Sequence, residues 1–191
     1  MLNKNILIIS CVFPPEVVTS ASTSLDTANT LASMGHKVTI ICPKPSRSVD
    51  LSWKYEINDS INVIKIASVS NNNSTFMKII ENFSFGISVY IYLFFRKSFD
   101  ICYMNSWPLI STFLISSVLK LKKTKYIYSV QDLYPDTLVI KGIVGPNSFI
   151  NKFLEKIEKS ICMSSHKVVT ISKSFEEYLI KQIGVNKEKI A

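Results

Sequence analysis

The chain has 191 residues, of which 47% are hydrophobic and 19% charged, a composition that supports one large folded domain and excludes a disordered protein. Its net charge of +8 favours an anionic partner, such as a phosphorylated small molecule, an acidic lipid or a nucleic acid. The basic residues are scattered as singles and pairs, without a basic-aromatic motif of the RNA-recognition kind. We therefore expect no nucleic-acid partner.

The four cysteines lie far apart, and no histidine stands at the spacing of a zinc ligand. They are Cys11, Cys42, Cys102 and Cys162. Three fall in or at the end of predicted strands and one falls late in a predicted helix. We interpret them as small buried hydrophobic residues of a protein in the reducing cytoplasm. No acidic pair suggests a divalent-metal site, and we expect no metal.

The first 66 residues predict three strands and one helix. Residues 6–12 form a continuous apolar run, typical of a strand that is covered on both faces. An apolar stripe that begins at Ala21 predicts a helix, and Gly35 stands where a left-handed helix cap belongs. Residues 37–42 form a second strand, and the alternating run 61–66 predicts a third strand near a sheet edge.

The rest of the chain continues to alternate strands with helices. The predicted strands span residues 100–104, 125–130 and 167–172. The predicted helices span residues 76–97, 109–121 and 148–163, and a last helix follows the sixth strand. Residues 44–60 and 70–74 are polar and are predicted to be loop and linker.

Two local signals concern the boundaries of the later helices. Pro135 excludes the helical region for the residue before it, so a helix should not start at once after the fifth strand. Residues 137–147 are predicted to form a loop. Ser174 is predicted to cap the last helix, with Glu177 three residues on as its reciprocal partner.

The second half of the long helix, residues 89–95, is apolar all round. A membrane-spanning helix needs roughly 20 apolar residues, and polar residues from Asn82 onward interrupt the run too early. Two alternatives remain. The segment packs beneath the sheet or against a partner domain, or it lies in a membrane interface with Arg96 and Lys97 at the headgroups.

Six strands alternating with helices predict an α/β fold with a doubly wound, parallel, Rossmann-like sheet. The carboxyl ends of the first, fourth, fifth and sixth strands should converge on one crevice, where ligands bind in such sheets. Polar and aromatic side chains follow these four ends and are the candidate site residues. They are Glu16, Thr19, Ser20, Asn105, Trp107, Asp132 and Ser172. Each also has a structural explanation, since Ser and Thr cap helices, Asp starts turns and Trp covers core edges.

Four segments form an ordered pattern. They are Ile-Leu-Ile-Ile-Ser with Phe-Pro-Pro-Glu (6–10 and 13–16), Leu-Ala-Ser-Met-Gly-His-Lys-Val-Thr-Ile-Ile-Cys-Pro (31–43), Gln-Asp-Leu-Tyr-Pro-Asp (131–136) and Val-Val-Thr-Ile-Ser-Lys-Ser-Phe (168–175). The pattern resembles the amino-terminal domain of the family 4 retaining glycosyltransferases. It looks most like the branch that builds bacterial O-antigen and capsule and includes the fucosamine transferases.

The resemblance implies the GT-B architecture, in which two Rossmann-like domains face each other across a cleft. In that family the amino-terminal domain binds the acceptor, often a lipid-linked sugar at the membrane. The carboxyl-terminal domain holds the nucleotide-sugar, largely through two glutamates eight positions apart, and no two glutamates of this chain have that separation. We therefore expect residues 1–191 to be the acceptor half of a transferase, with a carboxyl-terminal donor domain as its partner.

The resemblance also implies roles for single residues. Asp132 matches a position where the family places an acceptor-contacting acid or histidine, so we expect it to contact an acceptor hydroxyl and accept its proton. Thr19 and Ser20, beside a helix amino terminus, are expected to receive a phosphate oxygen. Val17 and Val18 stand near the places of two family glycines. The GT-B class works without a metal, so the nucleotide-sugar is the expected co-substrate and no cofactor is implied.

The expected location is cytoplasmic and peripheral on the inner membrane, with an anionic lipid surface as a further partner. Two other readings stay open at this point. The chain is a non-catalytic product of a truncated or split gene that binds a partner domain, or it is another Rossmann-type nucleotide enzyme. The missing G-x-G-x-x-G after the first strand argues against a common dinucleotide binder.

Overall fold

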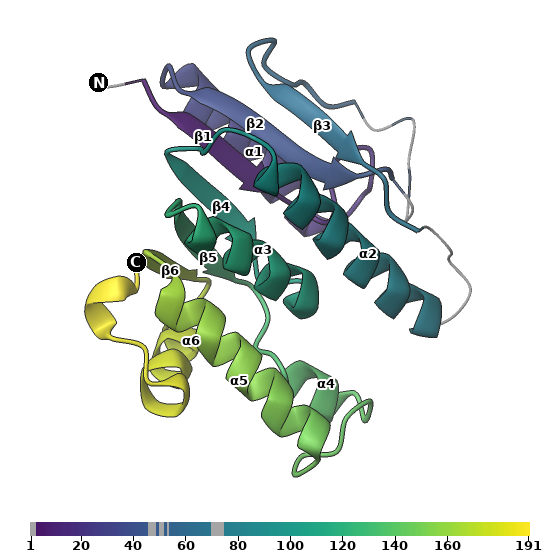
Figure 1. The fold of residues 1–191 in the computed structure, drawn as a ribbon, viewed down its shortest axis with the longest axis vertical. Coiled ribbons are helices and arrows are strands. Elements are labelled where there is room, and N and C mark those ends of the chain that lie inside the picture. Colours follow the sequence, from purple (N-terminus) through teal and green to yellow (C-terminus); the bar gives the residue numbers. More distant parts are fainter. Residues whose placement is uncertain (1–2, 46–48, 50–51, 53, 70–74) are drawn as a thin grey trace.

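The computed structural model describes residues 3–45, 49, 52, 54–69 and 75–191. Within them the chain forms one six-stranded parallel sheet, with strand order β3-β2-β1-β4-β5-β6 (Figure 1). The strands are β1 (Asn5–Ile9), β2 (Lys37–Pro43), β3 (Asn62–Ile66), β4 (Ile101–Asn105), β5 (Lys125–Val130) and β6 (Lys167–Thr170). All six predicted strands and their parallel arrangement are confirmed, and β3 lies at a sheet edge as expected.

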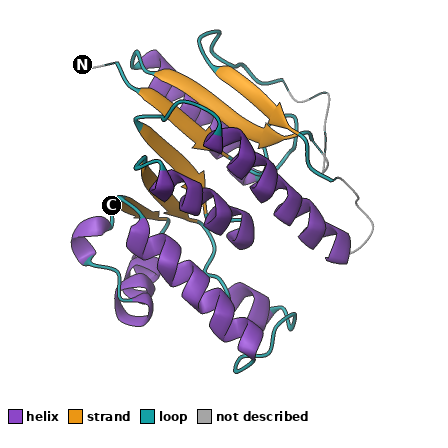
Figure 2. Ribbon diagram, viewed as in Figure 1, coloured by secondary structure: helices purple, strands orange, loops and turns teal. Residues whose placement is uncertain are grey.

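Helices connect most of the strands and cover the sheet (Figure 2). They are α1 (Thr19–Ser33), α2 (Thr75–Phe94), α3 (Leu109–Leu121), α4 (Asp136–Ile140), α5 (Phe149–Ser164) and α6 (Lys173–Tyr178). A π-helical turn (Leu179–Ile183) and a 3-10 turn (Lys187–Lys189) follow α6. The predicted linker at residues 70–74 lies outside the described residues.

The two faces of the sheet carry separate hydrophobic cores, because alternate residues of a strand point to opposite faces. Ile8 of β1 packs with Leu25 and Ala28 of α1 on one face. Leu7 and Ile9 belong to the larger core, which also contains buried side chains of α2, α3 and α5. A strand that is covered on both faces must be apolar throughout, which explains why the sequence of β1 shows no alternation.

The strand order reverses its direction between β1 and β4. From β1 the chain moves outward through β2 to the edge strand β3, and α2 then carries it back across the sheet to β4, from which it moves the other way. The loops after β1 and β4 therefore diverge toward opposite faces and leave the carboxyl ends of these two strands uncovered. In doubly wound sheets this switch point is where ligands bind.

Two local predictions are wrong. Residues 137–147 are not all loop, because α4 begins at Asp136 directly after Pro135. Proline restricts the residue before it but is compatible with the start of a helix. The cap of α6 is Ser172 rather than Ser174, since the Ser172 hydroxyl oxygen accepts a hydrogen bond from Phe175 N at 3.3 Å.

A third local prediction, the bond of Glu177 back to the cap, is also wrong, whereas the predicted helix end at Gly35 is confirmed. Gly35 has φ of +86°, and its N–H donates to Ala32 O at 2.9 Å, as expected for a residue that ends a helix in the left-handed region. Glu177 does not bond back to the cap; it accepts a hydrogen bond from Lys181 Nζ at 2.9 Å, one helical turn further on.

The apolar second half of α2 packs beneath the sheet with one face only. Phe85, Val89 and Leu93 are buried in the larger core. Ile91 and Phe94 of the opposite face are about half exposed. None of the helices in the described part of the chain is long and apolar enough to cross a bilayer.

We expect Gly86→Ala to destabilise the protein by about 1 kcal/mol or more. A Cβ atom on Gly86 would lie 2.7 Å from Ser111 Cα, so α2 and α3 would have to separate. Alanine favours a helix over glycine by about 1 kcal/mol. Overpacking costs about 1–3 kcal/mol, and here the clash is with backbone rather than with a flexible side chain. Urea denaturation measures the change in the free energy of unfolding.

Gly145→Ala is the matched control, because the nearest atom to its added Cβ would be 3.8 Å away, an ordinary contact. The free energy of unfolding of this variant should lie within about 0.5 kcal/mol of the wild-type value. Equal stabilities of the Gly86 and Gly145 variants would contradict a tight α2–α3 contact.

Candidate functional site

A pocket of about 350 Å³ opens at the switch point, at the carboxyl ends of β1, β4 and β5. Its residues come from the loops after these three strands, from the start of α1 and from the residue after α4. The lining residues are Ser10, Cys11, Val12, Val18, Ser20, Asn105, Trp107, Gln131, Asp132, Tyr134 and Lys141. The wall mixes hydroxyl, amide and charged groups with aromatic rings, as expected for a small polar ligand.

The hydroxyl of Ser106 holds the loop that carries Asp132. Ser106 is fully buried, and its N–H donates to Ser129 O of β5 at 2.9 Å. Its Oγ accepts hydrogen bonds from Gln131 N at 3.1 Å and from Asp132 N at 3.3 Å. The loop after β4 thus fixes the backbone of the loop after β5, and the exposed Asp132 carboxylate is left at the pocket rim.

A second cluster of polar side chains joins the loop after β1, the helix α1 and the end of β4 at the pocket. Ser24 Oγ of α1 lies 2.9 Å from Ser10 Oγ and 2.8 Å from Ser20 O. Asn105 Nδ2 lies 3.5 Å from Ser24 Oγ. The buried Asn105 Oδ1 has no hydrogen-bond partner among the described residues, so the amide retains an acceptor for a ligand donor.

Four of the seven candidate residues meet at this pocket, namely Ser20, Asn105, Trp107 and Asp132. The three others lie elsewhere. Glu16 is buried, and its Oε2 accepts a hydrogen bond from Phe13 N at 3.3 Å. Thr19 is exposed outside the lining, and Ser172 is engaged as the cap of α6. The carboxyl end of β6 therefore contributes no lining residue, and the roles of all seven in binding or chemistry stay predictions.

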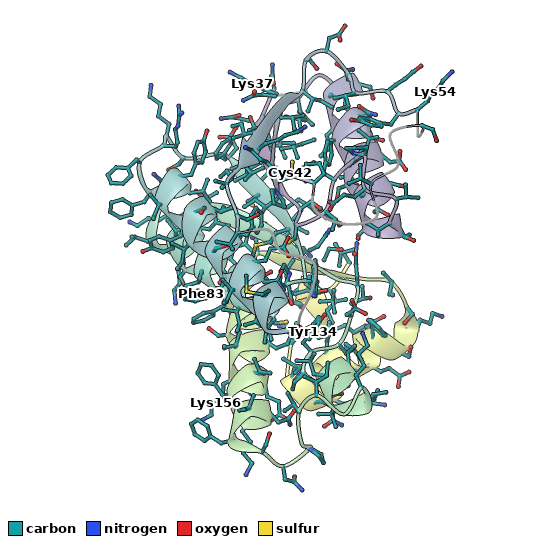
Figure 3. The ribbon with its side chains drawn as sticks, turned by 90° about the vertical axis from the view of Figure 1, so that its right-hand side faces the viewer. Lys37, Cys42, Lys54, Phe83, Tyr134 and Lys156 are labelled. Atoms are coloured by element: carbon teal, nitrogen blue, oxygen red, sulfur yellow. The ribbon has the colours of Figure 1, made fainter. Side chains whose placement is uncertain are left out.

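The pocket contains residues that sequence reasoning did not select. Ser10 lies within an apolar run that was interpreted as a buried strand, so it gave no signal of a site. Lys141 follows the helix α4, in a segment that was predicted to be loop. Tyr134 lies in the motif around Asp132, where an aromatic residue has no diagnostic spacing (Figure 3). Burial, with a smaller contribution from the charges of Asp132 and Glu158, raises the pKa of Tyr134, so its hydroxyl stays protonated.

The amino terminus of α1 borders the pocket through Val18 and Ser20. Val18 occupies the cap position and makes no side-chain cap hydrogen bond, since valine has no acceptor. The helix dipole favours an anion at this end of the pocket. Lys141 adds a positive charge to the pocket lining. Among the described residues no three histidine, cysteine, aspartate or glutamate side chains gather closely enough to hold a metal ion.

A comparison with known protein families identifies the family of this chain. The model of Glycosyltransferase Family 4 matches residues 21–191, which is most of the chain. The chain belongs to Glycosyltransferase Family 4. This confirms the family part of the resemblance that the four sequence segments indicated. No curated protein is significantly similar to this family 4 domain in sequence.

Solved GT-B glycosyltransferases share its fold. Sucrose-phosphate synthase from Thermosynechococcus elongatus aligns over 95% of this chain and 45% of its own, with a TM-score of 0.67 and 15% identity. The catalytic domain of starch synthase IV from Arabidopsis thaliana, bound to ADP and acarbose, aligns over 99% and 51%, with a TM-score of 0.63 and 12% identity.

A third relative is Alr3699/HepE from Anabaena in complex with UDP and glucose, with a TM-score of 0.58 and 9% identity over 99% of this chain and 44% of that one. At these identities the likeness shows the fold alone. This family 4 domain spans about half the length of these three chains, as one Rossmann-like half of a GT-B protein would.

A buried acid supports the strand that leads to Asp132. Tyr128 of β5 and Glu158 of α5 are fully buried, and the Tyr128 hydroxyl lies 3.1 Å from both carboxyl oxygens. Burial raises the pKa of Glu158 to about 8, although the hydrogen bond from Tyr128 opposes this shift. Glu158 is therefore mainly neutral at pH 7, and it joins α5 to the centre of β5 without a buried charge.

This acid predicts a pH-dependent stability. Unfolding lowers the pKa of Glu158 from about 8 to its ordinary value of 4.5, so the unfolded chain binds fewer protons between these values. The free energy of unfolding should therefore fall as pH rises from about 5 to about 8, by up to roughly 1 kcal/mol per pH unit from this group. Urea denaturation at several pH values measures the slope.

Glu158→Gln keeps the shape of the side chain and cannot ionise. Its free energy of unfolding should therefore change less with pH than that of the wild type. Glu155→Gln is the control, because Glu155 is exposed on the same helix and should leave the slope unchanged. Equal slopes in the wild type and in Glu158→Gln would contradict a neutral, buried Glu158.

Proposed function

We propose that this chain is the acceptor-binding half of a glycosyltransferase that moves a sugar from a nucleotide-sugar to a lipid-linked glycan in surface-polysaccharide biosynthesis. The observation that carries the proposal is the pocket at the switch point of a family 4 domain. A carboxylate, an amide with an unpaired acceptor and an aromatic ring meet there, and these groups suit a sugar. The motif resemblance favours the O-antigen and capsule branch and a cytoplasmic location.

Asp132 is the group best placed to act on an acceptor hydroxyl. Its carboxylate is exposed at the rim, while two hydrogen bonds to Ser106 hold the neighbouring backbone. A carboxylate within hydrogen-bond distance of the acceptor O–H would take its proton as the oxygen attacks the anomeric carbon. The bond from that carbon to the diphosphate breaks in the same transfer, and the diphosphate leaves with the nucleotide.

The positive side of the pocket suits a phosphate oxygen. Ser20 presents a hydroxyl at the start of α1, and Lys141 adds a positive charge. The N–H groups of a helix amino terminus bind anions. Val17 and Val18 stand near the places of two family glycines, so the backbone approaches such a group less closely here. The phosphate of the donor or of a lipid-diphosphate acceptor would be stabilised on this side.

We expect Asp132→Asn to lower kcat for sugar transfer by about 100-fold or more, because loss of a general base typically costs about 10²–10⁴-fold. The assay uses this chain together with a donor domain, a nucleotide-sugar pool and membrane-extracted acceptor. Transfer is followed by incorporation of radiolabelled sugar. Undiminished turnover in Asp132→Asn would remove Asp132 from the chemistry.

Asp26→Asn is the matched control, since Asp26 is an exposed carboxylate of α1 outside the pocket. It should transfer sugar at the wild-type rate. If the wild-type pair is inactive with every nucleotide-sugar while both domains are folded, the non-catalytic reading of the chain is favoured instead.

A further inference from the structure

The outer surface of α2 is apolar, although its inner surface already packs on the sheet. Phe85 and Val89 are buried, whereas Phe95, just after the helix, is 80% exposed. The exposed apolar residues recur at helical spacing along the whole helix. They are Ile79, Phe83, Ile87, Ile91, Phe94 and Phe95. A helix on the surface of a soluble domain normally shows water a polar face, so this helix lacks the usual pattern.

The helix α5 extends the same surface. It begins with three exposed apolar residues, Phe149, Ile150 and Phe153, of which Phe149 is 84% exposed. The helices α2, α3 and α5 pack side by side on one face of the sheet, with α3 in the middle. Figure 3 shows Phe83 and Lys156 on the same side of the molecule, outside this helix layer. We call the nine exposed residues of α2, its end and α5 the outer apolar surface.

Positive charges border the outer apolar surface, and few negative charges accompany them. The exposed basic residues of α3, α5 and the segments after α2 and α3 are Arg96, Lys97, Lys120, Lys123, Lys152, Lys156 and Lys159. The sequences of α2, α3 and α5 contain three acidic residues, and Glu81 and Glu158 are buried. Glu155 is thus the exposed carboxylate of these three helices. Asp100, in the segment after α2, is also exposed and accepts a hydrogen bond from Asn5 N at 2.6 Å.

At the end of α2 the aromatic and basic groups are held together. Phe94 packs edge-on against Phe95 with ring centres 5.2 Å apart, and the Arg96 guanidinium lies 4.9 Å from the centre of the Tyr92 ring. Lys122 Nζ donates to Phe94 O at 3.2 Å and also to Arg96 O. The two exposed phenylalanines are therefore presented from an anchored turn beside positive charge.

We propose that the outer apolar surface is a docking surface for an anionic phospholipid bilayer, with α2 lying flat in the interface. Apolar side chains that enter the headgroup layer, with lysine and arginine around them, are the features by which interfacial helices bind acidic lipid. Lysine is depleted at protein–protein interfaces, which makes a protein partner the poorer fit. The proposal does not depend on sugar transfer, because lipid binding needs no acceptor or nucleotide.

The test measures vesicle binding by the 191-residue chain. Vesicles of phosphatidylcholine alone, and of phosphatidylcholine and phosphatidylglycerol in equal parts, are floated through a density gradient. The chain should float with the acidic vesicles and be lost from them at high salt, because salt screens the attraction. The double variant Phe83→Ser/Ile91→Ser should bind acidic vesicles about tenfold or more weakly, since two half-exposed apolar side chains are removed.

Two matched control variants separate the surface from general effects. Met34→Ser/Ile171→Ser removes two exposed apolar side chains that lie outside α2, α3 and α5, and should bind like the wild type. Lys97→Gln/Lys120→Gln should weaken binding at least about fivefold, as each charge near an acidic surface contributes about 1 kcal/mol. Lys37→Gln/Lys54→Gln should leave binding unchanged, because Lys37 begins β2 and Lys54 lies in the segment before β3, both outside α2, α3 and α5. Figure 3 shows Lys54 on the side opposite Phe83.

A fluorescent label on a Phe95→Cys variant can report whether the end of α2 enters the lipid layer. The four native cysteines are buried, so a polarity-sensitive maleimide should react at the new position. Its emission should shift to the blue with acidic vesicles and stay unchanged with phosphatidylcholine. Equal flotation of the wild type and Phe83→Ser/Ile91→Ser would overturn the proposal. So would a wild-type dimer that this variant converts to a monomer while vesicle binding stays unchanged.

Discussion

The reversal of strand order between β1 and β4 is the constraint on which the rest of this structure depends. Two parallel strands whose connections leave toward opposite faces cannot cover their own carboxyl ends. Polar side chains from three strand ends meet in that gap: Ser10 just after β1, Asn105 at the end of β4 and Asp132 from the loop after β5.

Sequence patterns predicted the sheet well because β1 and β2 are buried on both faces, the edge strand β3 alternates, and proline and glycine mark many of the breaks. They failed where a single side chain had two roles open to it. Ser172 and Ser174 both suit a helix cap, and only the backbone of Phe175 selects Ser172. Glu16 follows the end of β1 as a pocket residue would, but its buried carboxylate accepts a hydrogen bond from Phe13 N and lies outside the pocket lining, while its role in binding stays a prediction. Ser106 had no distinguishing pattern, because its importance comes from amides 25 residues away.

The pocket and its support use polar groups in different ways. At the rim, the side chain of Asp132 remains in contact with water. In the core, Glu158 gives up its charge and serves as a neutral partner for Tyr128. A charged acid at that depth would cost several kcal/mol without a cation to pair with it. The same functional group, a carboxyl, is thus a candidate for chemistry at one place and a structural group at the other, and solvent access sets the difference.

The close approach at Gly86 has a consequence for communication across the domain. Ser111 of α3 touches Gly86 of α2 and donates to Asn82 O, and the next residue, Thr112, donates to Asn105 O at 3.2 Å. A continuous path therefore runs from the middle of α2 through the hydroxyls of Ser111 and Thr112, each bonded to a backbone carbonyl, to Asn105 of the pocket lining. Gly86 has no side chain that could change its rotamer when α2 tilts. Such a tilt would therefore displace Ser111 and Thr112 of α3 and, through their hydrogen bonds, Asn105.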